Sequence, residues 1–157
     1  MRRIYIAGKF SADTDLGIER NVCAAAAYIL PLATAGACPV CPHTCYRDFA
    51  HTLDYDRWIV ITRCLQEGCD ATLLIPDWKL SKGAQGESEH ARKLDQPRFY
   101  ATTPGMVPPE LLEWLAREPS LQQQADALYA RSLELALQAL GPAQLAAFDR
   151  RFTNYLR

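Results

Sequence analysis

Two acidic side chains stand out in this sequence because of the segments that surround them. Glu87 follows a turn-rich segment, 78–86, and we expect it at the start of a helix that runs to about Lys93. A carboxylate at a helix start lies in positive backbone potential and stays ionised, so it is a competent nucleophile toward an anomeric carbon. Asp70 precedes a buried apolar run and is the acid available to assist a leaving group.

The residues alone leave other interpretations of these acids open. The residues by themselves favour Glu87 as an ordinary helix N-terminal acid that stabilises the helix dipole. Glu89 is a rival carboxylate, but it lies two residues from Glu87 and points elsewhere on a helix, so only one of them can face a pocket. Ala91, one turn above Glu87, leaves room for a substrate.

The elements predicted around these acids are those of an α/β domain. Apolar and β-branched runs predict strands over 2–7, 37–42, 71–75 and 96–102, with the first one central. Helical spacing predicts a helix from about Leu16 to Pro31. The segment 56–68 fits a strand or a helix, and we choose a helix because parallel strands need a crossover. Ligands of such folds bind beyond the carboxyl ends of the strands.

The central stretch also resembles a known family. Ser81-x-Gly83-Ala84-x-x-Glu87-x-x-x-Ala91, after an apolar strand, is similar to the signature of the nucleoside 2-deoxyribosyltransferase-like superfamily, in particular its DUF4406 branch. Trp78 matches a Trp typical of that branch, and Pro42-His43-Thr44 matches a run often seen after its second strand. The resemblance covers roughly 1–101. It implies a flavodoxin-like, Rossmann-like parallel sheet with helices on both faces.

The resemblance also implies roles for individual residues. Glu87 would be the nucleophile that attacks C1′ of deoxyribose, Tyr5 would position it, and Asp70 would contribute to base handling. The expected substrate-binding residues, from the resemblance and from their places at strand ends and in loops, are Gly8, Lys9, Ser11, His43, Trp78, Ser81 and Gly83. Ser81 stands where the transferases often carry Asp, and Lys9 and Phe10 stand where the monophosphate hydrolases have a loop richer in Gly and Ser.

A cluster of thiols is the other group with possible chemistry. Cys38, Cys41, His43 and Cys45 could form a zinc or redox site. The pair Cys64-x4-Cys69 is poorly spaced to complete a structural zinc site, so we favour buried or loop thiols. We therefore expect no metal and no cofactor, and the zinc protein stays open as a weaker alternative.

Composition excludes some classes of partner. The net charge of −1 gives no electrostatic footprint for a nucleic acid polymer. No apolar run approaches the ~20 residues that span a bilayer, and the N-terminal apolar run is too short for a signal peptide. We expect a cytoplasmic protein whose partner is a small-molecule nucleoside or nucleotide, with no membrane partner.

The chain is predicted to divide into an α/β domain, 1–103, and a C-terminal helical extension, 104–157, that packs on the core or on a second subunit. Helices are expected from Pro108, over 121–140 and over 143–156. A homodimer is implied by the resemblance, because sites in that superfamily are often completed by a neighbouring subunit.

Two classes of function follow. The first is an enzyme, a hydrolase or transferase, that acts on the N-glycosidic bond of a 2′-deoxynucleoside or its 5′-monophosphate through Glu87. The alternative is a non-catalytic nucleotide-binding or scaffold protein on the same fold, because a fold does not fix a function. The base and the need for a 5′-phosphate stay open.

Overall fold

The structure is a computed structural model that describes residues 1–49, 52–117, 128–129, 131–132 and 134–135. The chain divides into two compact units, Met1–Glu118 and Pro119–Arg157. The described residues of the second unit have helical backbone. The helix predicted over 143–156 and most of the helix predicted over 121–140 lie outside the described residues. None of the described helices is long and apolar enough to cross a membrane.

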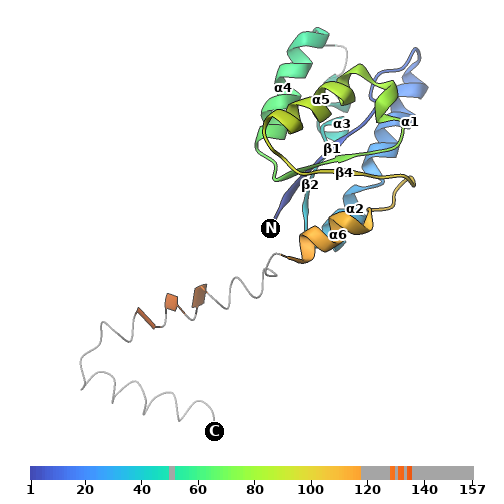
Figure 1. Cartoon of the computed structure of the whole chain (residues 1–157). Helices are drawn as coiled ribbons and strands as arrows, with labels where there is room; N and C mark the ends of the chain where they lie inside the picture. The colour runs from blue at the N-terminus through green and yellow to red at the C-terminus, as the bar shows by residue number, and fades with distance from the viewer. Residues whose placement is uncertain (50–51, 118–127, 130, 133, 136–157) are drawn as a thin grey trace, which may run out of the picture. The chain divides into compact units, whose positions relative to one another are not determined.

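The first unit is built on a four-stranded sheet of order β2-β1-β3-β4, in which every neighbouring pair is parallel (Figure 1). Its strands are β1 (Arg3–Ala7), β2 (Cys38–Val40), β3 (Ala71–Leu74) and β4 (Arg98–Tyr100). In the central strand, Tyr5 lies opposite Val40 on one side and Thr72 on the other. The predicted α/β class and the central place of the first strand are confirmed.

Helices cover both faces of this sheet. They are α1 (Asp15–Ala26), α2 (Ile29–Thr34), α3 (Pro42–Cys45), α4 (Tyr55–Glu67), α5 (Lys82–Lys93) and α6 (Pro109–Ala116), with short 3₁₀ turns at Arg47–Phe49 and Trp78–Leu80. Ile4 and Ile6 pack with residues of α1, α2 and α6 in the larger core. Tyr5 and Ala7, which point to the opposite face as strand alternation requires, form a second core that Leu65 of α4 joins.

Helix α5 begins earlier than its sequence pattern predicts. Ser81 caps it by accepting a hydrogen bond from the Ala84 N–H at 3.3 Å, and the helix starts at Lys82. Gly83 and Gly86, which we assigned to a turn, therefore lie inside the helix. A glycine in a helix costs about 1 kcal/mol, but the favourable cap and the packing of α5 on the sheet outweigh it. Glu87 consequently lies in the second turn and not at the helix start.

Helix α6, the first helix of the predicted C-terminal extension, packs on the α/β core. Leu111 and Leu115 are buried in the larger core. The Arg2 guanidinium lies 3.6 Å from the centre of the Trp114 ring and donates a hydrogen bond of 2.6 Å to the Trp114 carbonyl oxygen. Contacts with Arg2 and with the larger core thus hold α6 within the unit Met1–Glu118.

Candidate active site

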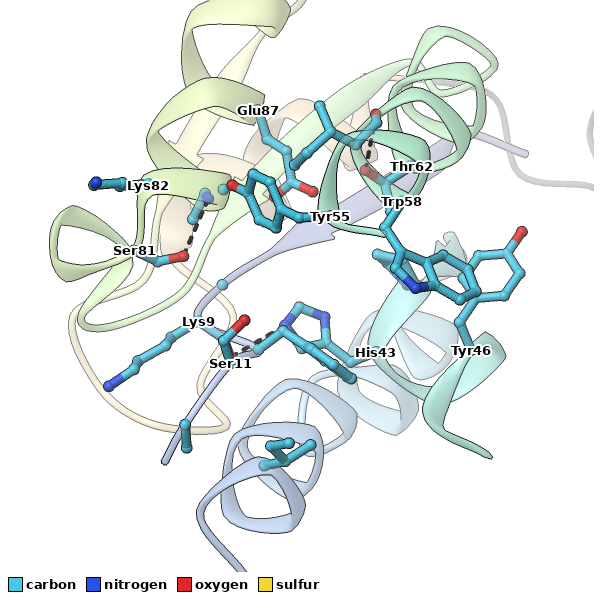
Figure 2. A pocket seen from close by; sticks show the side chains of 18 of the residues that line it. Lys9, Ser11, His43, Tyr46, Tyr55, Trp58, Thr62, Ser81, Lys82 and Glu87 are labelled. Atoms are coloured by element: carbon cyan, nitrogen blue, oxygen red, sulfur yellow. Dashed lines mark hydrogen bonds between the residues drawn. The ribbon is translucent and has the colours of Figure 1, made fainter. Parts of the chain in front are cut away.

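A cavity of about 550 Å³ opens at the carboxyl end of the central strand. Most of its lining comes from the loop 8–12 after β1, the segment 42–46 that contains α3, one face of α4, and the segment 80–87 that contains the first two turns of α5 (Figure 2). Ile18 of α1 and Leu53 complete the lining. This is the place where parallel sheets bind ligands, because the loops that follow neighbouring strands meet there. The volume falls within the range of small-molecule sites, roughly 300–1,000 Å³.

Glu87 is a buried acid that faces this cavity. The Tyr5 hydroxyl donates a hydrogen bond of 2.5 Å to Glu87 Oε1, and only 8% of Glu87 is exposed. Burial raises the pKa of Glu87 to about 7, against the opposing effects of the Tyr5 hydrogen bond and the charge of Arg63. Burial and the neighbouring carboxylate also raise the pKa of Tyr5 well above its ordinary value, so Tyr5 stays a donor.

The expectation that Glu87 stays ionised because of a helix terminus was therefore wrong. The side chain is in the second turn, away from the unpaired N–H groups that create the positive potential. Loss of water around the carboxylate dominates its pKa instead. At neutral pH the group exchanges between its acid and its nucleophilic carboxylate form, which suits a group that must attack and then leave.

A buried polar network holds the backbone of Glu87 in place. The Gln66 amide donates to the Glu87 carbonyl oxygen at 2.8 Å and to Thr72 Oγ1 at 3.0 Å. Thr72 donates to Gln96 Oε1 at 2.5 Å, and the Gln96 amide returns to the carbonyl oxygens of Gln66 and Cys69. The network ties α5 to α4 and to β3, so it fixes the position of the acid relative to the sheet.

One side of the cavity is cationic and polar. Lys9 and Ser11 come from the loop after β1, and Ser81 and Lys82 come from the start of α5. In Figure 2 the two amines extend on the same side of the cavity. Among residues 1–49 and 52–117, no acidic side chain pairs with either lysine. Together with the unpaired N–H groups of the first turn of α5, these side chains can bind an anion such as a phosphate.

Aromatic rings form the other part of the wall. Tyr46 and Trp58 lie with ring centres 5.1 Å apart, and Phe10 and His43 with centres 5.7 Å apart. His43 Nε2 lies 3.3 Å from the Lys9 carbonyl oxygen, and burial lowers the pKa of His43. Gly8 lets the loop after β1 pack closely on Ile75, since a Cβ there would lie 2.5 Å from the Ile75 side chain. Such rings can stack on a planar base.

Most of the predicted site residues come together here. The cavity is lined by Gly8, Lys9, Ser11, His43, Ser81, Gly83 and Glu87, and Tyr5 joins them through its bond to Glu87. Trp78 does not: its ring packs on the second core and lies 5.8 Å from the centre of the Tyr100 ring. It follows β3 closely in sequence, but its short 3₁₀ turn directs it to the sheet and away from the cavity.

Asp70 lies at the opposite end of the sheet. It precedes β3, so it belongs to the amino edge of the parallel strands, whereas the cavity is at their carboxyl edge. Its carboxylate accepts a hydrogen bond of 2.6 Å from the Arg3 N–H and lies 3.8 Å from Arg3 Nε. Asp70 was expected to take part in base handling, but its side chain contacts Arg3 at the start of β1 and does not line the cavity.

Sequence reasoning missed several residues of the cavity wall, namely Phe10, Tyr46, Tyr55, Trp58, Thr62 and Lys82. The signal for those on α4 was present. Tyr55, Trp58 and Thr62 recur at helical spacing, so they form a stripe along one face of the predicted helix. Each carries a polar atom on that stripe, and a stripe of this kind is better suited to a ligand cavity than to a dry core.

The cysteines of the described residues do not form a metal site. All six cysteines are free, and within the described ranges no group of three or more His, Cys, Asp or Glu side chains could hold a metal ion. Burial raises the pKa of Cys41 and brings that of Cys69 to about 11, so both stay thiols at neutral pH.

The fold and the cavity define a class: an α/β protein with a parallel sheet and a cavity of ligand size at its carboxyl edge. Within that class the chain belongs to the family described as a domain of unknown function, DUF7768, whose model matches residues 2–101. The match covers the whole sheet and all the segments that line the cavity. No curated protein matches the chain.

Proposed function

We propose that this protein cleaves the N-glycosidic bond of a 2′-deoxynucleoside or its 5′-monophosphate and passes the deoxyribosyl group to water or to a second base. The observation that supports this most is the hydrogen bond of 2.5 Å between Tyr5 and the buried carboxyl group of Glu87, beside a cavity of ligand size. The resemblance of the segment Ser81–Ala91 to deoxyribosyltransferase-like proteins agrees with this arrangement.

In the proposed reaction the ionised Glu87 attacks C1′. A C1′–O bond forms, the C1′–N bond breaks, and its electron pair leaves with the base. The departed base takes up a proton from solvent. Water or a second base then attacks C1′ and releases Glu87 as a carboxylate, and the proton that either nucleophile loses goes to solvent. The Tyr5 hydroxyl stabilises the carboxylate and fixes Oε1, which limits the orientations that the nucleophile can adopt.

The two sides of the cavity suit the two ends of a nucleotide. The rings of Tyr46, Trp58 and His43 offer faces and edges for a base. Lys9 and Lys82, with the first turn of α5, offer charge and N–H groups for a 5′-phosphate. The sugar then lies between them, where Glu87 is.

A panel of 2′-deoxynucleosides and their 5′-monophosphates, with and without a free acceptor base, tests the proposal by base release. Glu87→Gln should reduce release by about a thousandfold or more, because the amide is not a nucleophile. Glu89→Gln is the matched control: this exposed carboxylate on the same helix pairs with Arg92 and should leave the rate unchanged. Equal rates for the two variants would refute the proposal.

A second pair of variants, Lys9→Ala and its control Lys79→Ala, tests whether the cavity binds a 5′-phosphate. Lys9→Ala should weaken the use of monophosphates by about tenfold and leave free nucleosides unaffected. Lys79→Ala, an exposed lysine beside the Trp78 ring and outside the cavity lining, is the control. Nucleotide binding with no release from any member of the panel would favour the non-catalytic alternative.

A further inference from the structure

Gln66 of α4 is a fully buried amide that binds the main chain of Glu87. Its side chain donates to the Glu87 carbonyl oxygen at 2.8 Å and to Thr72 Oγ1 at 3.0 Å. The opposite orientation of the amide would place its oxygen against the Glu87 carbonyl oxygen, and both of these atoms can only accept. The orientation is therefore determined, and both N–H groups of the amide are in use.

The oxygen of the Gln66 amide is buried without a hydrogen-bond partner within the parts of the chain that the structure describes. A buried oxygen without a partner costs free energy. Methionine or leucine would fill a similar volume without that cost. The position therefore keeps an amide for its two N–H donors, and one of these donors binds the residue that carries the proposed reaction.

Glu87 is held at its carboxylate and at its main chain by two neighbouring strands. Tyr5 and Thr72 lie opposite each other in the register of β1 and β3. Tyr5 donates to Glu87 Oε1, and Thr72 accepts from the amide that binds the Glu87 carbonyl oxygen. Among the described residues, none donates to Oε2, and this oxygen is not fully buried. Oε2 is therefore the oxygen that remains for C1′ of a substrate in the cavity.

The contacts of α5 with α4 on either side of this bond are looser. Gly86 lies beside the guanidinium of Arg63, whose side chain is exposed. His90 Nε2 lies 3.1 Å from the Glu67 carboxylate, which is 52% exposed. Exposed, flexible side chains of this kind do not fix a helix to a fraction of an ångström. The buried bond from Gln66 is the contact that can do so.

We propose that Gln66, bonded to Thr72, is a positioning residue for Glu87: it fixes the main chain of the acid so that Tyr5 holds Oε1 while Oε2 meets C1′. The effect on a rate rests on the proposed function. A nucleophile that is misplaced by about 1 Å loses roughly a hundredfold in rate. Loss of the Gln66 bond should therefore reduce the rate of the chemical step and leave the binding of the substrate in place.

Gln66→Met removes both donors and keeps the length of the side chain. With the nucleoside or monophosphate of the panel that the protein cleaves fastest, kcat should fall about tenfold to a hundredfold, and KM should stay within about twofold. Gln96→Met is the matched control, because Gln96 is a buried amide that binds Thr72 and no atom of Glu87. Its kcat should stay within about twofold. Equal losses of kcat in the two variants, or a loss confined to KM, would overturn the inference.

Thr72→Val tests the bond between Gln66 and β3 with little change of shape. Valine has the branched form of threonine and suits a strand, but it cannot accept from Gln66. We expect kcat to fall about threefold or more, with KM unchanged. This variant also serves where Gln66→Met does not fold, and an unchanged kcat in Thr72→Val would contradict the inference.

The titration of Glu87 gives a readout that needs no turnover. Carbon-13 NMR of the glutamate carboxyl groups identifies Glu87 by the signal that is absent from Glu87→Gln. The groups that act on its charge are Tyr5 of β1 and Arg63 of α4, and neither is substituted. Because the Tyr5 hydrogen bond lowers the pKa of Glu87, its weakening in Gln66→Met should raise the titration midpoint by about half a pH unit or more. Gln96→Met should leave the midpoint in place.

The two readouts separate this inference from the proposed function. If no member of the panel releases a base but the midpoint rises only in Gln66→Met, the proposed reaction is contradicted and the positioning of Glu87 by Gln66 is supported. If the original protein releases a base and the midpoint and kcat of Gln66→Met match those of Gln96→Met, only the positioning role is contradicted.

Discussion

Asp70 and Glu87 are the acids that bracket β3 and the turn after it, and the structure places them in opposite surroundings. The Asp70 side chain is 42% exposed and lies beside an arginine at the amino edge of the sheet. Glu87 is buried at the carboxyl edge, with a phenol as its direct partner. The first acid is open to water, whereas burial opposes the charge of the second. An acid becomes useful for chemistry where its ionised form is held out of water beside a ligand cavity.

The largest effect that this comparison predicts is on stability as a function of pH. Because the pKa of Glu87 is about 7 in the folded protein and 4.5 as its ordinary value, the folded state binds the proton more tightly. The stabilisation from Glu87 is fully present below pH of about 4.5 and is lost as pH rises through about 7. The free energy of unfolding should thereby fall by about 3 kcal/mol.

Glu87→Gln isolates this contribution, because the amide does not titrate. Urea unfolding at pH 5 and pH 8 should show the stability difference between the variant and the original protein shifting by about 2.5 kcal/mol in favour of the variant at pH 8, because part of the full change lies outside this interval. His43, also buried, titrates in both proteins and cancels from that difference. Glu89→Gln should show no such shift, and a flat difference for Glu87→Gln would mean that the Glu87 pKa is ordinary.

Tyr5→Phe removes the hydrogen-bond donor of Glu87 and tests how far this bond sets the Glu87 pKa. The Tyr5 hydrogen bond lowers the pKa of Glu87, so Tyr5→Phe should move that pKa above about 7. The rise of base release with pH, which follows ionisation of Glu87, should shift to higher pH. The maximal rate should fall roughly tenfold to a hundredfold, as for a hydrogen bond to a charged group.

Tyr28→Phe is the matched control for Tyr5→Phe. Tyr28 is another fully buried tyrosine, and its hydroxyl donates to the Thr103 carbonyl oxygen at 2.8 Å, so its loss should cost stability but leave the pH profile in place. A pH profile that moves equally in both variants would show that Tyr5 acts only through packing.

The sequence predicts the strands and the residues that follow them, because local sequence patterns determine these features. A β-branched and aromatic run in β1 and continuous apolarity in β3 predict the strands, and parallel topology then brings Gly8, His43 and Glu87 to one edge. The start of α5 was predicted too late, because Gly83 and Gly86 were taken as signs of a turn although Ser81 caps the helix. The expectation that Glu87 stays ionised was wrong for a different reason. Burial sets its pKa, and burial depends on packing between α4, α5 and the sheet, which local sequence does not show.

Distance along the chain also explains why Asp70 and Trp78 were misjudged. Both are close to β3 in sequence, yet one lies at the amino edge and the other packs on Tyr100. Tyr55 and Trp58 are farther from Glu87 in sequence and line the same cavity. Which face of a helix meets a cavity and which meets a core is decided by the neighbouring elements. Periodicity alone does not distinguish the two faces, and only the polar atoms on the α4 stripe point to a cavity.

The smallest predicted effect is that of Asp70→Asn. The amide keeps an acceptor for the Arg3 N–H and removes only an ion pair whose atoms are 3.8 Å apart and exposed to solvent. Exposed pairs of this kind contribute about 0–1 kcal/mol, so urea unfolding should shift by no more than that. Base release should stay within about twofold of the original protein. A tenfold loss without a matching loss of stability would mean that the amino edge of the sheet takes part in the reaction, through a neighbouring chain or a movement of β3. If the rate holds while Glu87→Gln abolishes it, the functional difference between the two acids follows from burial and position.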